Sequence, residues 1–283
     1  MRAAAHAMRR AAPWLLALGL AAAHAAPASR PPPVPVRADK IVLVGDSTVQ
    51  AHSGWGGAFC ARHAAPFLAC LNLGRGGRSS YSYRAEGSWE LARRELRGGG
   101  YGRVWVLIQF GHNDQPGKPE RSTDLAEEFP ANLRRYVDEA RADGARPVLV
   151  TPLTRRQFRD GRLVDDLAPW AEAIRRVARE RQVPLVDLHA RSVAAVQALG
   201  PVASMRFAQR PATPELVAAA LQGTTAEAPP APAPPPAAAD ATAPLRLAFD
   251  YTHLGGAGAE FFAALVADEL ARAVPELRPR LLP

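Results

Sequence analysis

Cysteine and lysine are both scarce in this chain of 283 residues. Its two cysteines, Cys60 and Cys70, cannot complete a four-ligand zinc site without two further ligands, and no C-x-x-C pair is present. Its two lysines, Lys40 and Lys118, leave arginine to carry nearly all of the positive charge. There is no basic run with interleaved aromatic residues, so we expect no nucleic-acid partner.

The chain also lacks an apolar run long enough for a membrane span, which needs about 20 residues. The run "APWLLALGLAAA" is shorter, follows three arginines and precedes "AHA". This pattern predicts a signal peptide over residues 1–25 and an exported protein, periplasmic or extracellular, with no membrane span after cleavage. Without those arginines the formal charge of +8 falls to about +5, and a basic surface favours acidic partners. Export favours a disulfide between Cys60 and Cys70, with two buried thiols as the alternative.

Short apolar runs alternate with long amphipathic stretches along the rest of the chain. The runs are residues 41–45, 67–73, 104–110, 146–151 and 183–188. Alternation of strand and helix predicts one α/β domain with an open, five-stranded parallel sheet that helices cover on both faces.

Two segments are rich in proline, one before this domain and one within it. A Pro-rich leader covers residues 26–38, and the domain itself is expected over residues 39–275, with a tail at 276–283. Within it, a Pro/Ala-rich insertion is expected at about residues 201–244, because "AEAPPAPAPPPAAADATAP" cannot pack a core.

Polar residues follow the strand ends, where ligands bind in open α/β sheets. The groups are Asp46-Ser47-Thr48, the glycine-rich "GRGGRSS", His112-Asn113-Asp114, "TPLTRRQF", Asp187 to His189, and Asp250 with His253. Each alone has a structural interpretation, as a helix cap, a turn or a tight loop.

Together these groups fit an esterase, which needs a nucleophile, a base, an orienting acid and donors for the oxyanion. Ser47 is the candidate nucleophile, at the start of an expected helix whose N-terminal field would favour it. His112 and His189 also reach this edge, but only His253 has a carboxylate, Asp250, three residues before it in a turn. The oxyanion donors would be the backbone N–H groups of Ser47 and Gly77 and the side chain of Asn113.

The blocks "GDSTVQ", "GGRSSYSY", "RAEGSW", "FGHNDQ", "VTPLTRRQF" and "DYTHLGGAGAE" resemble the SGNH (GDSL-like) hydrolases, and within them the rhamnogalacturonan acetylesterase family. The resemblance implies a flavodoxin-like three-layer fold with strand order 2-1-3-4-5. It assigns Ser47 as nucleophile, His253 as base and Asp250 as its orienting acid, with Gly77 and Asn113 in the oxyanion hole. It implies no metal or cofactor and the removal of O-acetyl groups from a pectic polysaccharide.

An acidic polymer would suit arginine, which can hold a carboxylate bidentately. Arg78 and Arg155 are the candidate substrate-binding residues, with Arg156 beside the latter. Three alternatives stay open: the same triad acting on another acetylated glycan or acyl ester, a metal-dependent phosphoesterase, and a non-catalytic glycan-binding protein. The metal site of the second would use Asp46, Asn113, Asp250 and His253.

Overall fold

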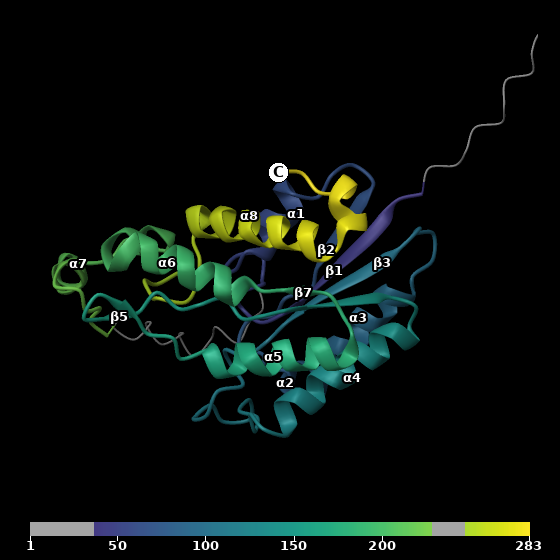
Figure 1. The fold of residues 1–283 in the computed structure, drawn as a ribbon, viewed down its shortest axis with the longest axis horizontal. Coiled ribbons are helices and arrows are strands. Elements are labelled where there is room, and N and C mark those ends of the chain that lie inside the picture. Colours follow the sequence, from purple (N-terminus) through teal and green to yellow (C-terminus); the bar gives the residue numbers. More distant parts are fainter. Residues whose placement is uncertain (1–36, 228–246) are drawn as a thin grey trace, which may run out of the picture. The chain divides into compact units, whose positions relative to one another are not determined.

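Five parallel strands form the central sheet of the computed structural model, which describes residues 37–227 and 247–283. They are β1 (Asp39–Gly45), β2 (Leu68–Asn72), β3 (Val104–Gln109), β4 (Arg146–Val150) and β7 (Leu185–Val186). Their spatial order is β2-β1-β3-β4-β7 (Figure 1). Because β7 is the fifth strand of this sheet, the predicted α/β class and the strand order 2-1-3-4-5 are confirmed.

Alternate residues of each central strand point to opposite faces of the sheet. Ile41 and Leu43 of β1 pack on one face, and Val42 and Val44 pack on the other, all fully buried. The first face is covered by α1 (Gly56–Arg62), α6 (Leu188–Ser204) and α8 (Gly256–Ala273). The second is covered by α3 (Ser88–Arg97), α4 (Glu128–Ala142) and α5 (Ala168–Arg181). Figure 1 shows the sheet between these two helical layers. Near-continuous apolar runs in the sequence therefore reflect strands that are buried on both faces.

The folded chain continues past residue 201, where we expected the insertion to begin. Helix α6 bends at Gly200, whose φ is 78°, and is followed by η1 (Met205–Phe207) and α7 (Pro214–Leu221). The Thr213 side chain caps α7, and Pro214 occupies its first turn, where proline is tolerated. The part of the expected insertion over residues 201–221 is therefore folded into helices and is not an extended loop. Residues 228–246 of the expected insertion, and the expected signal peptide and most of the leader (1–36), lie outside the described residues.

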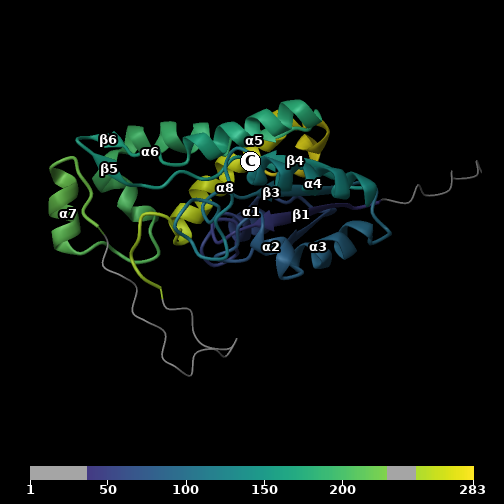
Figure 2. The ribbon, with the colours of Figure 1, turned by 90° about the horizontal axis from the view of Figure 1, so that it is seen from below.

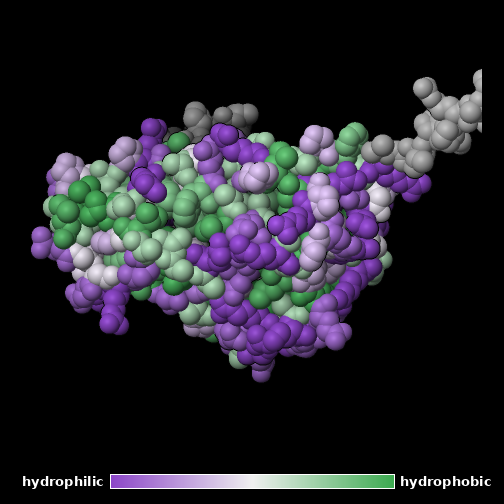
Figure 3. Space-filling model, turned by 45° about the horizontal axis from the view of Figure 1, so that its top comes forward, coloured by the Kyte–Doolittle hydropathy of each residue, from purple (hydrophilic) through white to green (hydrophobic). Residues whose placement is uncertain are grey.

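Helix α7 lies beside α6 and the hairpin of β5 (Phe158–Arg159) and β6 (Arg162–Leu163) (Figure 2). It buries Leu216 in a small cluster with Phe249 and Tyr251. Leu221 at its end is 68% exposed, and Figure 3 shows apolar surface gathered at this end of the sheet domain.

The expected tail at 276–283 packs onto the domain. Its first residues belong to η2 (Pro275–Arg280), where Leu277 is buried, and the Leu282 N–H donates to the carbonyl oxygen of His63. These contacts make the tail a part of the folded domain. Across residues 37–227 and 247–283, no helix combines the length and the apolar character that crossing a membrane requires.

Candidate active site

A tight turn, rather than the expected helix, carries Ser47 past the end of β1. Asp46 Oδ1 accepts hydrogen bonds from the backbone N–H and the Oγ1 hydroxyl of Thr48, both at 2.8 Å. Helix α1 begins only at Gly56. An Asp side chain that satisfies the N–H two residues on stabilises a turn as readily as a helix start, so the expectation that Ser47 begins a helix was wrong.

A buried polar network lies behind this turn. Gln109 Nε2 donates to Thr48 Oγ1 at 2.6 Å and Trp55 Nε1 donates to Gln109 Oε1 at 3.0 Å. Asp46 Oδ2 lies 3.5 Å from Nδ1 of the buried His112. Burial alone raises the pKa of Asp46, but His112 and the Thr48 hydrogen bonds outweigh it and hold the pKa below its ordinary value. Burial lowers the pKa of His112. The network fixes the turn and leaves the Ser47 side chain on its open side.

His253 lies between Ser47 and Asp250, which the sequence places 206 and 3 residues away from it. Its Nε2 is 2.9 Å from Ser47 Oγ, and its Nδ1 is 2.8 Å from Asp250 Oδ2. Burial alone raises the pKa of Asp250, but hydrogen bonds from the His253 ring and the turn backbone lower it to about 2. An ionised Asp250 holds the ring proton on Nδ1, so Nε2 is free to accept the hydroxyl proton of Ser47.

The loop that carries this pair is held from inside by Arg156. Asp250 Oδ1 accepts the N–H groups of Thr252 and His253 at 2.7 and 2.6 Å, which closes the turn. The guanidinium of Arg156, 1% exposed, donates to the carbonyl oxygens of Asp250, Thr252 and His253. Arg156, considered above for substrate binding, therefore supports the loop.

Ser53 ties the nucleophile turn to the histidine loop. Its hydroxyl donates to the carbonyl oxygen of Ser47 at 2.7 Å, and its own carbonyl oxygen accepts the N–H of Leu254 at 2.9 Å. One buried serine thereby sets the separation of the two loops whose side chains meet.

The glycine-rich loop after β2 passes directly against the nucleophile. A Cβ added at Gly76 would lie 3.7 Å from the Cβ of Ser47, and Gly77 has a φ of 76°, which suits glycine. Asn113 Nδ2 donates to the carbonyl oxygen of Arg78 at 3.1 Å. An amide nitrogen has two hydrogens, so Asn113 keeps a second donor for an oxyanion.

The buried Asp114 joins the glycine-rich loop to the loop of Asn113. Its carboxyl group accepts hydrogen bonds from the Ser80 N–H and hydroxyl, the Gly111 N–H and the Thr123 hydroxyl. Burial raises the pKa of Asp114 to about 7. The structure therefore brings Ser47, His253 and Asp250 into contact, and it joins Asn113 to the glycine-rich loop that passes Ser47 and carries Gly77.

Residues 43–261 match the GDSL-like lipase/acylhydrolase family. The chain belongs to this family. Two Bacillus subtilis proteins are similar to it: the probable rhamnogalacturonan acetylesterase YesY, 34% identical over 56% of this chain and 73% of that protein, and the rhamnogalacturonan acetylesterase RhgT, 36% identical over 59% and 72%. The solved structure of the Bacillus subtilis protein YxiM has a similar fold, with a TM-score of 0.60 and 22% identity. The alignment covers 84% of this chain but only 57% of that one.

As a member of this hydrolase family, the chain is an enzyme that hydrolyses acyl esters. Three other candidate side chains at the site edge, His189, Arg155 and Arg78, each have an acidic partner. His189 Nε2 lies 2.8 Å from Asp165 Oδ1, and Arg155 is paired with Asp166. Arg78 is paired with Glu86 at 2.8 Å. Within residues 37–227 and 247–283, no three His, Cys, Asp or Glu side chains cluster as metal ligands would.

Two residues that hydrogen-bond to the loops of this GDSL-like site, Asn72 and Arg156, were not assigned such a contact from the sequence. The motif "NLG" places Asn72 two residues before Gly74, a spacing typical of a side-chain-closed turn. This signal could have identified Asn72. No local pattern identifies Arg156, because its partners lie more than 90 residues away.

Proposed function

We propose that this protein is an exported serine esterase that removes O-acetyl groups from an acidic, rhamnogalacturonan-like polysaccharide. The observation that carries the proposal is the contact of Ser47 Oγ with His253 Nε2. Two relatives of about one-third identity bear the name rhamnogalacturonan acetylesterase, which supports acetylated carbohydrate as the substrate class. The signal-peptide pattern supports export.

The reaction proceeds in two halves. His253 Nε2 takes the proton of Ser47 as Oγ attacks the acetyl carbonyl carbon, and the resulting oxyanion accepts N–H groups of Ser47, Gly77 and Asn113. The C–O bond to the sugar then breaks, and the sugar oxygen takes the proton from His253. In the second half water gives a proton to His253 as its oxygen attacks the acetyl-serine carbonyl. The bond to Ser47 Oγ then breaks, Oγ takes the proton back from His253, and acetate leaves.

A hollow of about 670 Å³ adjoins Gly77 and offers groups that could bind a sugar acid. It is lined in part by Arg78, Tyr81 and Arg121, and also by Glu86 and Glu120. Tyr81 is 46% exposed and offers a ring face to a sugar, while guanidinium groups suit a carboxylate. Arg155 does not line this hollow. We therefore assign the substrate role to Arg121 and to Arg78, whose guanidinium also pairs with Glu86.

The test is release of acetate by the purified protein from acetylated pectic rhamnogalacturonan, acetylated xylan and p-nitrophenyl acetate. We expect the rhamnogalacturonan to give the highest kcat/KM, and Ser47→Ala to abolish acetate release from all three while leaving the thermal unfolding curve unchanged. Turnover by Ser47→Ala equal to that of the wild type would contradict the serine mechanism. Preference for xylan would retain the esterase but reject the pectic substrate.

A chelator arm separates the remaining alternatives. Activity that EDTA removes and added divalent metal restores would support a metal-dependent hydrolase. Binding of acetylated glycans without acetate release from any of them would support a non-catalytic role.

A further inference from the structure

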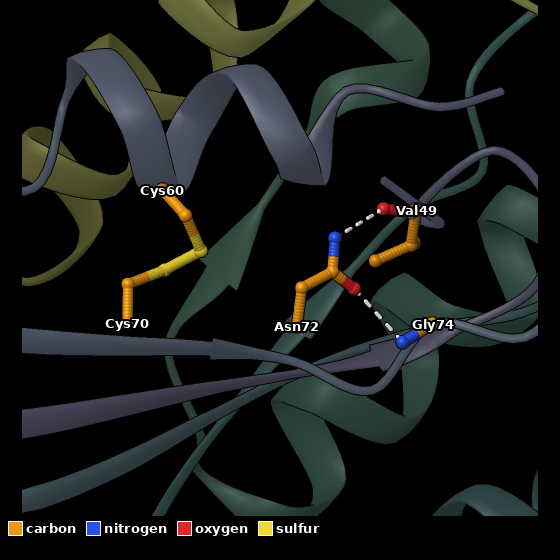
Figure 4. The surroundings of a disulfide bond; sticks show 5 residues. All are labelled: Val49, Cys60, Cys70, Asn72 and Gly74. Carbon is orange, nitrogen blue, oxygen red and sulfur yellow. Dashed lines mark hydrogen bonds between the residues drawn. A yellow bond between two sulfur atoms is a disulfide. The ribbon is translucent and has the colours of Figure 1, made fainter. Parts of the chain in front are cut away.

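Asn72, the last residue of β2, bridges two loops of the candidate site with its side chain (Figure 4). Its Nδ2 donates to the carbonyl oxygen of Val49 at 2.9 Å. Its Oδ1 accepts the backbone N–H of Gly74, also at 2.9 Å. Val49 belongs to the turn that carries Ser47, and Gly74 begins the glycine-rich loop that carries Gly77. One amide group therefore links the nucleophile to a donor of the oxyanion hole.

The bridge lies where the backbones approach too closely for other side chains. A Cβ added at Gly56 would lie 2.3 Å from the Val49 carbonyl oxygen and 2.5 Å from Asn72 Nδ2. A Cβ added at Gly74 would lie 2.8 Å from the Gln50 nitrogen and 3.0 Å from Asn72 Oδ1. Real Cβ atoms do not tolerate the shortest of these distances, so the two glycines permit the approach that Asn72 then fixes.

The bridged loops also meet at the nucleophile itself. The Arg75 N–H donates to the carbonyl oxygen of Gly45 at 2.8 Å, so the glycine-rich loop continues alongside the end of β1. At the next residue, Gly76, an added Cβ would lie 3.7 Å from the Ser47 Cβ, so the loop backbone passes close to the nucleophile. A change in the separation of the two loops would thus move Gly77 relative to Ser47 directly.

A disulfide also joins α1 to β2, the elements from which the two bridged loops extend. Cys60 lies in α1, which follows the nucleophile turn, and Cys70 lies in β2 two residues before Asn72. Figure 4 shows the disulfide and the Asn72 bridge side by side between α1 and β2. The disulfide limits how far α1 and β2 can separate, and Asn72 fixes the loops that extend from them.

We propose that Asn72 is a positioning residue for ester hydrolysis, setting the position of the oxyanion donor at Gly77 relative to the nucleophile Ser47. The inference rests on the esterase function proposed above. A hydrogen-bond donor must lie within a few tenths of an ångström of its place to stabilise the tetrahedral oxyanion, whereas ester binding in the ground state depends on it much less. Loss of the bridge should therefore lower kcat and leave KM nearly constant.

Two substitutions test the bridge. Asn72→Ala removes both hydrogen bonds, and Asn72→Asp keeps the size and the acceptor for Gly74 but cannot donate to Val49. We expect both to lower kcat for p-nitrophenyl acetate by about 10-fold to 100-fold, after normalisation to the folded fraction. Asn72→Asp keeps the test informative if the smaller side chain prevents folding.

A matched control is available at Gln197. Its side chain also bridges two backbone groups, donating to the Gly161 carbonyl oxygen at 3.0 Å and accepting the Leu163 N–H at 2.8 Å. That bridge joins α6 to the β5–β6 hairpin, outside the site. Gln197→Ala should therefore reduce stability as Asn72→Ala does but leave kcat unchanged.

A transition-state analogue separates positioning from a general structural effect. Methylboronic acid adds Ser47 Oγ to boron, the hydroxyl proton passes to His253, and the anionic tetrahedral adduct mimics the intermediate. Its inhibition constant should rise in the Asn72 variants by the same factor as kcat/KM falls. A role confined to stability would lower the folded fraction and leave the inhibition constant of the folded protein unchanged.

The outcomes distinguish this inference from the proposed function. An active wild type with Asn72 variants that retain its kcat and its affinity for methylboronic acid would overturn the positioning role alone. A wild type that releases no acetate from any ester would overturn the esterase function first. If Asn72→Asp kept the wild-type kcat while Asn72→Ala did not, the proposal would also be overturned, because the hydrogen bond to Val49 would then be dispensable.

Discussion

One guanidinium nitrogen of Arg156 donates to the carbonyl oxygens of both Asp250 and His253, at 2.9 and 3.0 Å. The side chain is buried, and burial lowers its pKa to about 10, which still leaves it charged at neutral pH. A permanent charge inside the domain is costly unless hydrogen bonds compensate it. Here the compensating carbonyl groups belong to the loop that carries the base and its orienting acid.

Replacing Arg156 with Met should therefore reduce both stability and activity. Three carbonyl oxygens lose their donor, which we expect to cost about 2–4 kcal/mol of the free energy of unfolding. A displaced His253 should also lower kcat for p-nitrophenyl acetate. Urea unfolding and steady-state kinetics measure the two effects. Arg94→Met on the exposed face of α3 is the control, with an expected change within about 0.5 kcal/mol; equal behaviour of the two variants would refute the assignment.

Asp250 should give the protein a pH-dependent stability in the acid range. Its pKa lies at about 2 in the folded protein, against an ordinary value of 3.8. A lowered folded-state pKa contributes stability above the unfolded pKa, and that contribution is lost as pH falls from about 4 towards 2. Because the side chain is 34% exposed, solvent screening reduces the contribution to about 1 kcal/mol.

The measurement compares urea unfolding of the wild type and Asp250→Asn between pH 6 and pH 2.5. The stability difference between them should shrink as the pH falls through this window. Two curves that stay parallel would show that Asp250 is not stabilised in its ionised form. The same variant should lose kcat by up to about 10⁴-fold at neutral pH, because an amide can hold the wrong tautomer of His253.

The disulfide between Cys60 and Cys70 should stabilise the domain through the unfolded chain. It closes a loop with a sequence separation of 10, for which chain entropy gives about 3 kcal/mol. Cys60→Ser/Cys70→Ser should lower the free energy of unfolding by roughly that amount. Equilibrium unfolding of the wild type with and without dithiothreitol should reproduce the difference. Insensitivity of the wild type to dithiothreitol in the denatured state would show that the bond does not form.

The sequence predicted the features that show as an alternation of apolar and amphipathic segments or as a short local motif. Five apolar runs alternating with helical periods predicted a doubly covered parallel sheet, because burial on both faces leaves no polar alternation. Asp250-x-x-His253 was identifiable because both side chains act within one turn. The family blocks located Ser47, Gly77 and Asn113.

Contacts between distant segments were not predictable in this way. Arg156 was considered for substrate binding, since its charge is visible in the sequence while its burial beneath Asp250 is not. The prediction of a helix at Ser47 was wrong because an Asp side chain can accept the N–H two residues on either in a turn or at a helix start. The sequence pattern is the same in both cases. Helix α7 was included in the expected insertion although Pro214 after a capping Thr213 is a pattern that favours a helix start.

Arg121 should determine the preference for acidic polysaccharide. Its guanidinium adjoins the hollow beside Gly77 and reaches that residue's carbonyl oxygen at 3.4 Å, which leaves N–H groups available for a carboxylate. Arg121→Gln should lower the ratio of kcat/KM for acetylated rhamnogalacturonan to that for acetylated xylan by about 10-fold. The difference from the wild type should diminish in 0.5 M NaCl, because salt screens exposed charges.

Two further variants control this prediction. Arg121→Lys should restore part of the ratio. Arg159→Gln on the β5–β6 hairpin removes the same charge outside the hollow and is the matched control. An equal fall of the ratio in both glutamine variants would show that net charge, and not this hollow, selects the acidic polymer.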